Sequence, residues 1–136
     1  MEQTQKQLDL LFQIANNSGQ SIESLVGLFQ KGAIAARDLG ASEQDLFKFV
    51  KITSDALKIQ GTSAEESRGA LLQLSQALST GIVRAEEFNS ILENAYPLAL
   101  AAARGIKDAA GSVGQLRLMI VKGKVTSEEF FRAVIS

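Results

Sequence analysis

Apolar side chains recur at spacings of three and four residues in the first half of the chain, which is the pattern of amphipathic helices. The first such stripe ends at the polar cluster of residues 16–20, and the next three end shortly before Gly40, Gly61 and Gly81. Glycine just beyond a periodic segment is typical of a helix C-terminus, so the sequence predicts four helices here. Their apolar residues are, in chain order, Leu8, Leu11, Phe12 and Ala15; Ile22, Leu25, Leu28, Phe29 and Ala36; Leu46, Phe49, Val50, Thr53 and Leu57; and Ala70, Leu71, Leu74, Ala77 and Leu78.

Serines precede the second, third and fourth of these stripes, where a helix N-terminus needs acceptors for its free amides. Ser21 precedes the second stripe. Ser42 and Ser63 are each followed three residues later by a carboxylate, that of Asp45 or Glu66, in the order that forms a capping box. We therefore expect helices to begin directly after these serines.

The second half of the chain has shorter periodic segments. Pro97 interrupts them, because the residue before a proline resists the helical conformation, and residues 105–114 contain three glycines and are expected to form a loop. The small residues of 98–103 fit a core helix better than an exposed helix-docking face. The expected helices are residues 85–94 with Phe88, Ile91 and Leu92 on one side, 98–104, 116–121, and a last helix capped by Thr126 that carries Phe130, Ala133 and Val134.

No segment alternates apolar and polar residues for long enough to indicate a strand. The prediction is an all-α fold, a compact bundle of about six or seven helices with no sheet, in a single domain over residues 1–136.

The composition narrows the possible functions. Hydrophobic residues make up 46% of the 136 residues, enough for one continuous core. The 14 Lys and Arg nearly balance the 15 Asp and Glu and are not clustered, which argues against a nucleic-acid interface. The absence of Cys and His excludes disulfides, structural zinc and imidazole chemistry. The polar start is not a signal peptide, and the longest apolar stretch, residues 98–103, is too short for a membrane segment.

One motif, Gly-x-Val-x-x-Glu-Glu-Phe, begins at Gly81 and again at Gly123, 42 residues later. The calcium loop of an EF-hand has a similar order of glycine, aliphatic residue and glutamate, but it needs oxygen ligands at its first, third and fifth positions. Those positions hold Gln76, Leu78 and Thr80 in the first copy and Leu118, Ile120 and Lys122 in the second. We therefore predict that neither copy binds calcium and that the motif is a helix–turn–helix connection used twice.

The side chains that could support catalysis have structural explanations. The paired carboxylates all fall in first turns of expected helices, where negative charge is favourable, and the serines have no His to act as a base. No Gly-rich phosphate loop of the Gly-Lys-Ser/Thr type occurs, and the arginines are scattered. The residues considered were Glu65-Glu66, Glu86-Glu87, Glu128-Glu129, Ser24, Ser54, Ser75, Ser90, Arg68, Arg84, Arg104 and Arg117. We predict a protein that is not an enzyme and has no catalytic, cofactor-binding or metal-binding residues.

The order of these segments resembles the tape measure domain of tailed-phage and prophage tail tape measure proteins, from about Gln7 to the end of the chain. The most specific part is the run of residues 70–93, which follows Gly-Thr-Ser-Ala-Glu-Glu at 61–66. Weaker matching pieces are residues 39–46, 114–117 and 123–129, whereas residues 104–113 depart from the family's more regular spacing.

This resemblance implies a structural role in tail length determination and tail assembly. The implied partners are tail tube, tail tip and tail assembly chaperone proteins, with self-association of the full-length protein, in the virion tail and in the bacterial cytoplasm during assembly. The apolar last helix, without a C-terminal cap, leads us to expect that the domain is a fragment of a much longer polypeptide. The alternative is a stand-alone helical adaptor that binds a partner helix in a groove.

Overall fold

The computed structural model describes residues 5–136, which are helical apart from their connections and one isolated β-bridge. The elements are α1 (Gln5–Ser18), α2 (Ile22–Leu39), α3 (Glu43–Gln60), α4 (Ala64–Ser79), α5 (Ala85–Asn94), α6 (Tyr96–Gly105), the 3₁₀-helix η1 (Lys107–Ala109), α7 (Val113–Val121) and α8 (Ser127–Ile135). The all-α prediction is confirmed. The described part has eight α-helices, one more than the estimate of six or seven, and the four in the second half correspond to the four short segments expected there.

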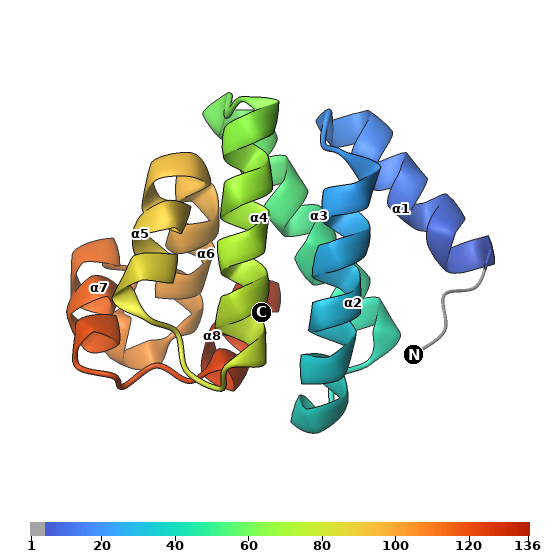
Figure 1. The fold of residues 1–136 in the computed structure, drawn as a ribbon. Helices are drawn as coiled ribbons and strands as arrows, with labels where there is room; N and C mark the ends of the chain where they lie inside the picture. Colours follow the sequence, from blue (N-terminus) through green and yellow to red (C-terminus); the bar gives the residue numbers. More distant parts are fainter. Residues whose placement is uncertain (1–4) are drawn as a thin grey trace.

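Helices α2, α3 and α4 form the centre of the first half. Figure 1 shows α2 and α4 standing side by side and running in the same direction, with α3 returning behind them and α1 on the outer side of α2. The stripes predicted for these three helices form the core, since all of their members are buried except Ile22, which is half-buried. Burial of one continuous apolar stripe per helix is what holds such short helices in place.

The prediction for α1 was partly wrong. Phe12 is 48% exposed, and the buried positions are Gln7, Leu11, Ala15 and Ser18. The helix is turned so that Gln7 faces the core side, where its Nε2 donates a hydrogen bond to Glu43 Oε2 at 3.0 Å. The helix also continues into the predicted polar break as far as Ser18.

The predicted helix ends are confirmed at three glycines with positive φ. Gly40 and Gly61 follow α2 and α3 with φ of 71° and 74°, and Gly81 follows α4 with φ of 86°. A side chain with a Cβ would be strained in this left-handed conformation. The position of each glycine after its helix is therefore a backbone requirement.

The predicted capping boxes are present in one case and incomplete in the other. At α3, Ser42 Oγ accepts from the Asp45 amide at 3.1 Å and Asp45 Oδ2 accepts from the Ser42 amide at 3.2 Å. At α4, Ser63 Oγ accepts from the Glu66 amide, but its hydroxyl donates to Glu66 Oε1 at 2.9 Å. The Glu66 carboxylate is then held by the hydroxyl, and the reciprocal bond to the Ser63 amide is missing.

Helix α6 is the centre of the second half. Leu98, Ala99, Ala102 and Ala103 have no exposed surface, which confirms the Ala-rich stretch as a core helix. The loop expected at residues 105–114 is shorter than predicted, because α6 runs to Gly105, η1 occupies three of its residues and α7 begins at Val113.

Helix α8 joins the two halves. It packs against α6 so closely that a Cβ on Gly105 would lie 2.3 Å from the carbonyl oxygen of Ala133. On the side of the first half, the rings of Phe131 and Phe49 stack with centroids 4.9 Å apart. The predicted apolar face of this helix is confirmed.

The two copies of the repeated motif lie side by side. Their turns, residues 81–84 and 123–126, are linked by an antiparallel bridge between Ile82 and Thr126. The Val83 amide donates to the Val125 carbonyl at 3.0 Å, and the Ser127 amide donates to the Gly81 carbonyl at 3.0 Å. The helix pairs α4–α5 and α7–α8 are thereby joined through their turns.

In the part of the chain that the structure describes, no helix combines the length and the apolarity needed to cross a membrane.

Candidate functional site

The carboxylate pairs lie where the sequence placed them, in the first turns of α4, α5 and α8. The second glutamate of two pairs caps its own helix: Glu87 Oε1 accepts from the Arg84 amide at 3.0 Å, and Glu129 Oε1 accepts from the Thr126 amide at 3.3 Å. Negative charge here meets the positive end of the helix dipole. These side chains therefore stabilise the N-termini of their helices.

Two of the four serines considered as nucleophiles are engaged by the backbone of their own helices. Ser54 and Ser75 are buried, and their hydroxyls donate to the carbonyls of Val50 and Leu71 at 2.9 and 2.8 Å. Ser24 lies on the surface side of α2. No side chain able to act as a base is hydrogen-bonded to any of these three within residues 5–136.

The arginines do not converge. Arg68, Arg84, Arg104 and Arg117 are all exposed and belong to different helices or helix starts. Over residues 5–136, no three His, Cys, Asp or Glu side chains come together in an arrangement that could hold a metal ion. At the first repeated turn, Leu78 belongs to the core, and Thr80 Oγ1 donates to the Gln76 carbonyl at 3.0 Å. The absence of calcium binding stays a prediction.

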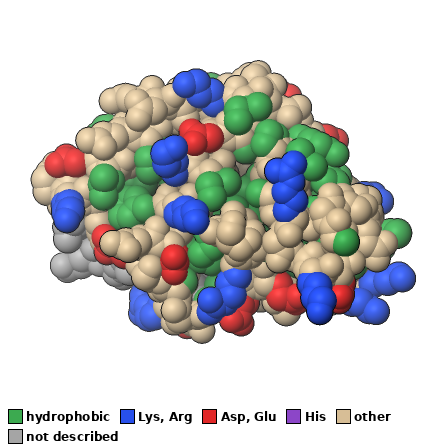
Figure 2. All heavy atoms as spheres, turned by 180° about the vertical axis from the view of Figure 1, so that it is seen from behind, with side chains coloured by type: hydrophobic (Ala, Val, Ile, Leu, Met, Phe, Trp, Pro, Cys, Tyr) green, Lys and Arg blue, Asp and Glu red, His purple; other side chains and the backbone are tan. Residues whose placement is uncertain are grey.

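Charges of both signs are spread over the face opposite to that of Figure 1. Figure 2 shows Lys and Arg side chains distributed over this face, Asp and Glu side chains between some of them, and patches of hydrophobic side chains among them. A nucleic-acid interface depends on a cluster of one sign. This face has no such cluster.

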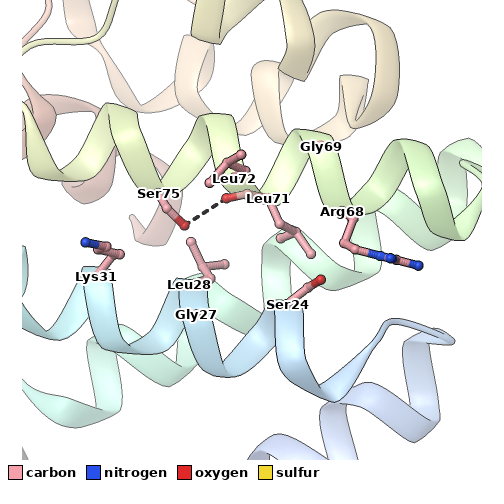
Figure 3. A pocket seen from close by; sticks show the side chains of 9 residues that line it. All are labelled: Ser24, Gly27, Leu28, Lys31, Arg68, Gly69, Leu71, Leu72 and Ser75. Carbon is pink, nitrogen blue, oxygen red and sulfur yellow. Dashed lines mark hydrogen bonds between the residues drawn. The ribbon is translucent and has the colours of Figure 1, made fainter.

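A groove lies between α2 and α4 on the described surface, and we call it the α2–α4 groove. Its volume is about 410 Å³, and its surface is largely apolar. Figure 3 shows Leu28 and Leu71 between the two helices, with Lys31 at one end and Arg68 at the other. The nine lining residues are Ser24, Gly27, Leu28, Lys31, Arg68, Gly69, Leu71, Leu72 and Ser75.

Two helical positions on the walls of the groove lack a Cβ. Gly27 and Gly69 both lie within helices, and a Cβ built on either would meet no atom within 4 Å. Packing inside the domain therefore does not require glycine at these positions, although glycine in a helix interior costs about 1 kcal/mol relative to alanine. Beside them, Leu72 is 60% exposed.

The two cations of the groove have no ion-pair partner among residues 5–136. The ion pairs among residues 5–136 are Lys51 with Asp55 and Arg132 with Glu128, and neither Lys31 nor Arg68 has a hydrogen-bond partner there. Sequence reasoning considered Arg68 only as a member of a scattered set. The signal that could have identified the groove is a helical glycine beside a leucine outside the apolar stripe, as in Gly69 and Leu72.

A family model described as tape measure protein matches residues 1–136, the whole of the chain. No curated protein and no solved structure matches it.

Proposed function

Since the chain belongs to the tape measure protein family, whose members are structural proteins of phage tails, we propose that it is a folded domain of a longer tape measure polypeptide that contributes to tail length determination and tail assembly. The observation that carries this proposal is the match of the family model over all 136 residues. The family is one of structural phage proteins, and we propose that this chain has no enzymatic activity, which agrees with the structural use of Glu87, Glu129, Ser54 and Ser75.

The shape of the domain suggests how it takes part. A helical ruler gains about 1.5 Å per residue only when its helix is extended. The longest helices here have 18 residues, roughly 27 Å each, and they fold back on one another. The domain therefore adds little length for its 136 residues. We propose that it serves as a compact unit for assembly contacts, attached to extended segments that measure the tail.

The proposed partners are tail tube, tail tip and tail assembly chaperone proteins, with self-association of the full-length protein. We place these contacts in the bacterial cytoplasm during assembly and in the virion tail afterwards. Support comes from the family match, which implies the context of a phage tail. The apolar side chains with the largest exposure, Ile59, Leu72, Val121, Ile34 and Leu118, lie singly on the surface and do not identify a partner.

A second candidate function is a stand-alone adaptor that binds a partner helix. The α2–α4 groove favours this alternative, since its walls are helices and its floor is apolar. The two functions differ in whether the domain needs the extended segments that measure the tail. An adaptor binds its partner without these segments, whereas a tape measure domain no longer contributes to tail length when they are removed.

The test is a deletion series in the phage or prophage that encodes the protein, with tail lengths measured by electron microscopy. In-frame deletions in predicted rod segments should shorten tails in proportion to the residues removed, at about 1.5 Å per residue. Deletion of α4 should abolish assembly or produce lengths off this line, because loss of part of one core unfolds the domain. Unchanged tail length after a large rod deletion would overturn the proposal.

A further inference from the structure

The α2–α4 groove combines three properties that the fold itself does not need. Its floor is apolar, its two helical glycines leave the backbone uncovered, and its two cations have no partner within residues 5–136. We propose that the groove binds an amphipathic helix of a partner protein, with the partner's apolar side chains on Leu28, Leu71 and Leu72 and with acidic side chains at Lys31 and Arg68. This inference stands on the surface alone and does not depend on the role in tail length.

The walls of the groove select a helix over an extended peptide. Binding of an extended strand requires a free sheet edge with unpaired amides and carbonyls, whereas α2 and α4 use theirs internally. A helix laid along two parallel helices places its side-chain ridge into the groove between them. The missing Cβ atoms at Gly27 and Gly69 let its backbone approach closely, as small residues do at other helix–helix contacts.

The charges define the partner further. Lys31 lies seven residues after Ser24 on α2, and Arg68 lies seven residues before Ser75 on α4. Because the two helices run in the same direction (Figure 3), the cations occupy opposite ends of the groove, about two helical turns apart. Two acidic residues that lie seven positions apart on a partner helix have the same separation as these cations. The residues three and four positions after the first acidic residue lie on the same face of that helix, between the two carboxylates.

The same charges disfavour a second copy of this chain in the groove. A two-fold axis in the plane of the groove, whether along it or across it, would bring a second cation to each end of the groove that already holds one. Two like charges would then face each other across an apolar contact, where the repulsion is stronger than in water. A partner with carboxylates at those places neutralises both cations.

The test uses three synthetic helical peptides that differ only in one pair of residues seven positions apart. The pair is two Glu in the first peptide, two Gln in the second and two Lys in the third. All three peptides carry leucines three and four residues after the first member of the pair. Binding to the full chain is measured by fluorescence anisotropy. We expect the Glu peptide to bind at least about tenfold more tightly than the Gln peptide and the Lys peptide to bind least, with a difference that falls at high salt.

The matched variant is the double substitution Lys31→Glu and Arg68→Glu. Both side chains are exposed, so the fold should be unaffected. In this variant the order of the peptides should reverse. Failure of the Glu peptide to bind at millimolar concentration, or an unchanged order in the variant, would overturn the proposal. Dimerisation of the chain through the groove in analytical ultracentrifugation would also overturn it, in favour of a second copy.

Two alanine variants separate binding from stability. Gly27→Ala and Gly69→Ala should each raise the melting temperature by a few degrees, because alanine is the better helix former and the space is open. Each should nevertheless weaken the Glu peptide about tenfold by blocking close approach. Gly114→Ala, in α7 and off the groove, is the control that should leave peptide binding unchanged. More stable variants with undiminished affinity would contradict the proposed contact.

Discussion

The turn between α4 and α5 and the turn between α7 and α8 have the same motif but different surroundings. Both have a glycine with positive φ, at Gly81 and Gly123, and a buried valine, at Val83 and Val125. These shared residues fix the backbone of the turn and attach it to the core. Both copies need them for the same reason.

The differences between the turns arise from what each one touches. At the helix start, Thr126 accepts a hydrogen bond from the Glu129 amide, whereas Arg84 has a side chain that cannot accept one. One position later, Ser127 is buried and its hydroxyl donates to the Ala77 carbonyl near the end of α4. The second turn thus donates a side-chain hydrogen bond to α4 of the first helix pair. The equivalent residue of the first turn, Ala85, has no side-chain donor and cannot make such a bond to the second pair.

The largest expected effect concerns a residue that the two copies share. Phe88→Ala and Phe130→Ala should each lower the free energy of unfolding by about 3–5 kcal/mol, because each ring is fully buried and its removal leaves a cavity. Urea denaturation followed by circular dichroism measures the loss. Similar values for both are expected. A loss below about 1 kcal/mol in either would contradict the equivalence of the two positions.

The next effect should occur in the second turn only. Ser127→Ala removes the hydrogen bond to Ala77, one of the last four carbonyls of α4 and therefore without a partner in its own helix. We expect a loss of about 1–3 kcal/mol in the free energy of unfolding. The control is Ala85→Ser, which should change stability by less than about 0.5 kcal/mol. Equal effects from both variants would show that the asymmetry is absent.

A smaller pair of effects should have opposite signs. Thr126→Ala removes an N-cap acceptor and should destabilise by about 1 kcal/mol, whereas Arg84→Ser supplies one and should stabilise by about 0.5–1 kcal/mol. Thermal unfolding of the two variants beside the unsubstituted chain gives both signs in one experiment. Destabilisation by Arg84→Ser would mean that the arginine has a role that its hydrogen bonds do not reveal.

No effect at all is expected from calcium. The first, third and fifth loop positions of both turns lack carboxylates, so the ion should add no binding free energy to the native state. The melting temperature should be the same in millimolar calcium and in chelator. A rise in calcium that chelator reverses would show that at least one turn is a calcium loop.

The sequence was sufficient where a structural feature depends on residues within about one helical turn. The stripes of α2, α3 and α4 and the glycines that end these helices are of this kind. It failed for the face of α1, because the orientation of that helix depends on its packing against α2 and α3, where Gln7 bonds Glu43, 36 residues later in the chain. At Ser63, the sequence permits either of two bonds to Glu66, and the pattern does not distinguish them.

The candidate site was less predictable than the fold. The repeated motif was visible in the sequence, but the pairing of its two turns depends on how α4 and α8 pack. The α2–α4 groove likewise requires Gly27 and Gly69 to lie on facing helices, which neither helix specifies alone. The sequence indicated only that positive and negative charges nearly balance and that catalytic motifs are absent. Both observations argue against particular kinds of site and do not locate a binding surface.

The position of α8 at the junction of both halves also fixes the order of events during synthesis. Its ring at Phe131 stacks on Phe49, and Arg132 Nη2 donates to the Leu39 carbonyl, 93 residues earlier, at 2.5 Å. Ribosomes add about 5–20 residues per second. Between the end of α4 at Ser79 and the end of α8 at Ile135, the first half of the nascent chain therefore waits roughly 3–11 s for the helix that covers it. During that interval its apolar surface is open to aggregation or to a binding protein.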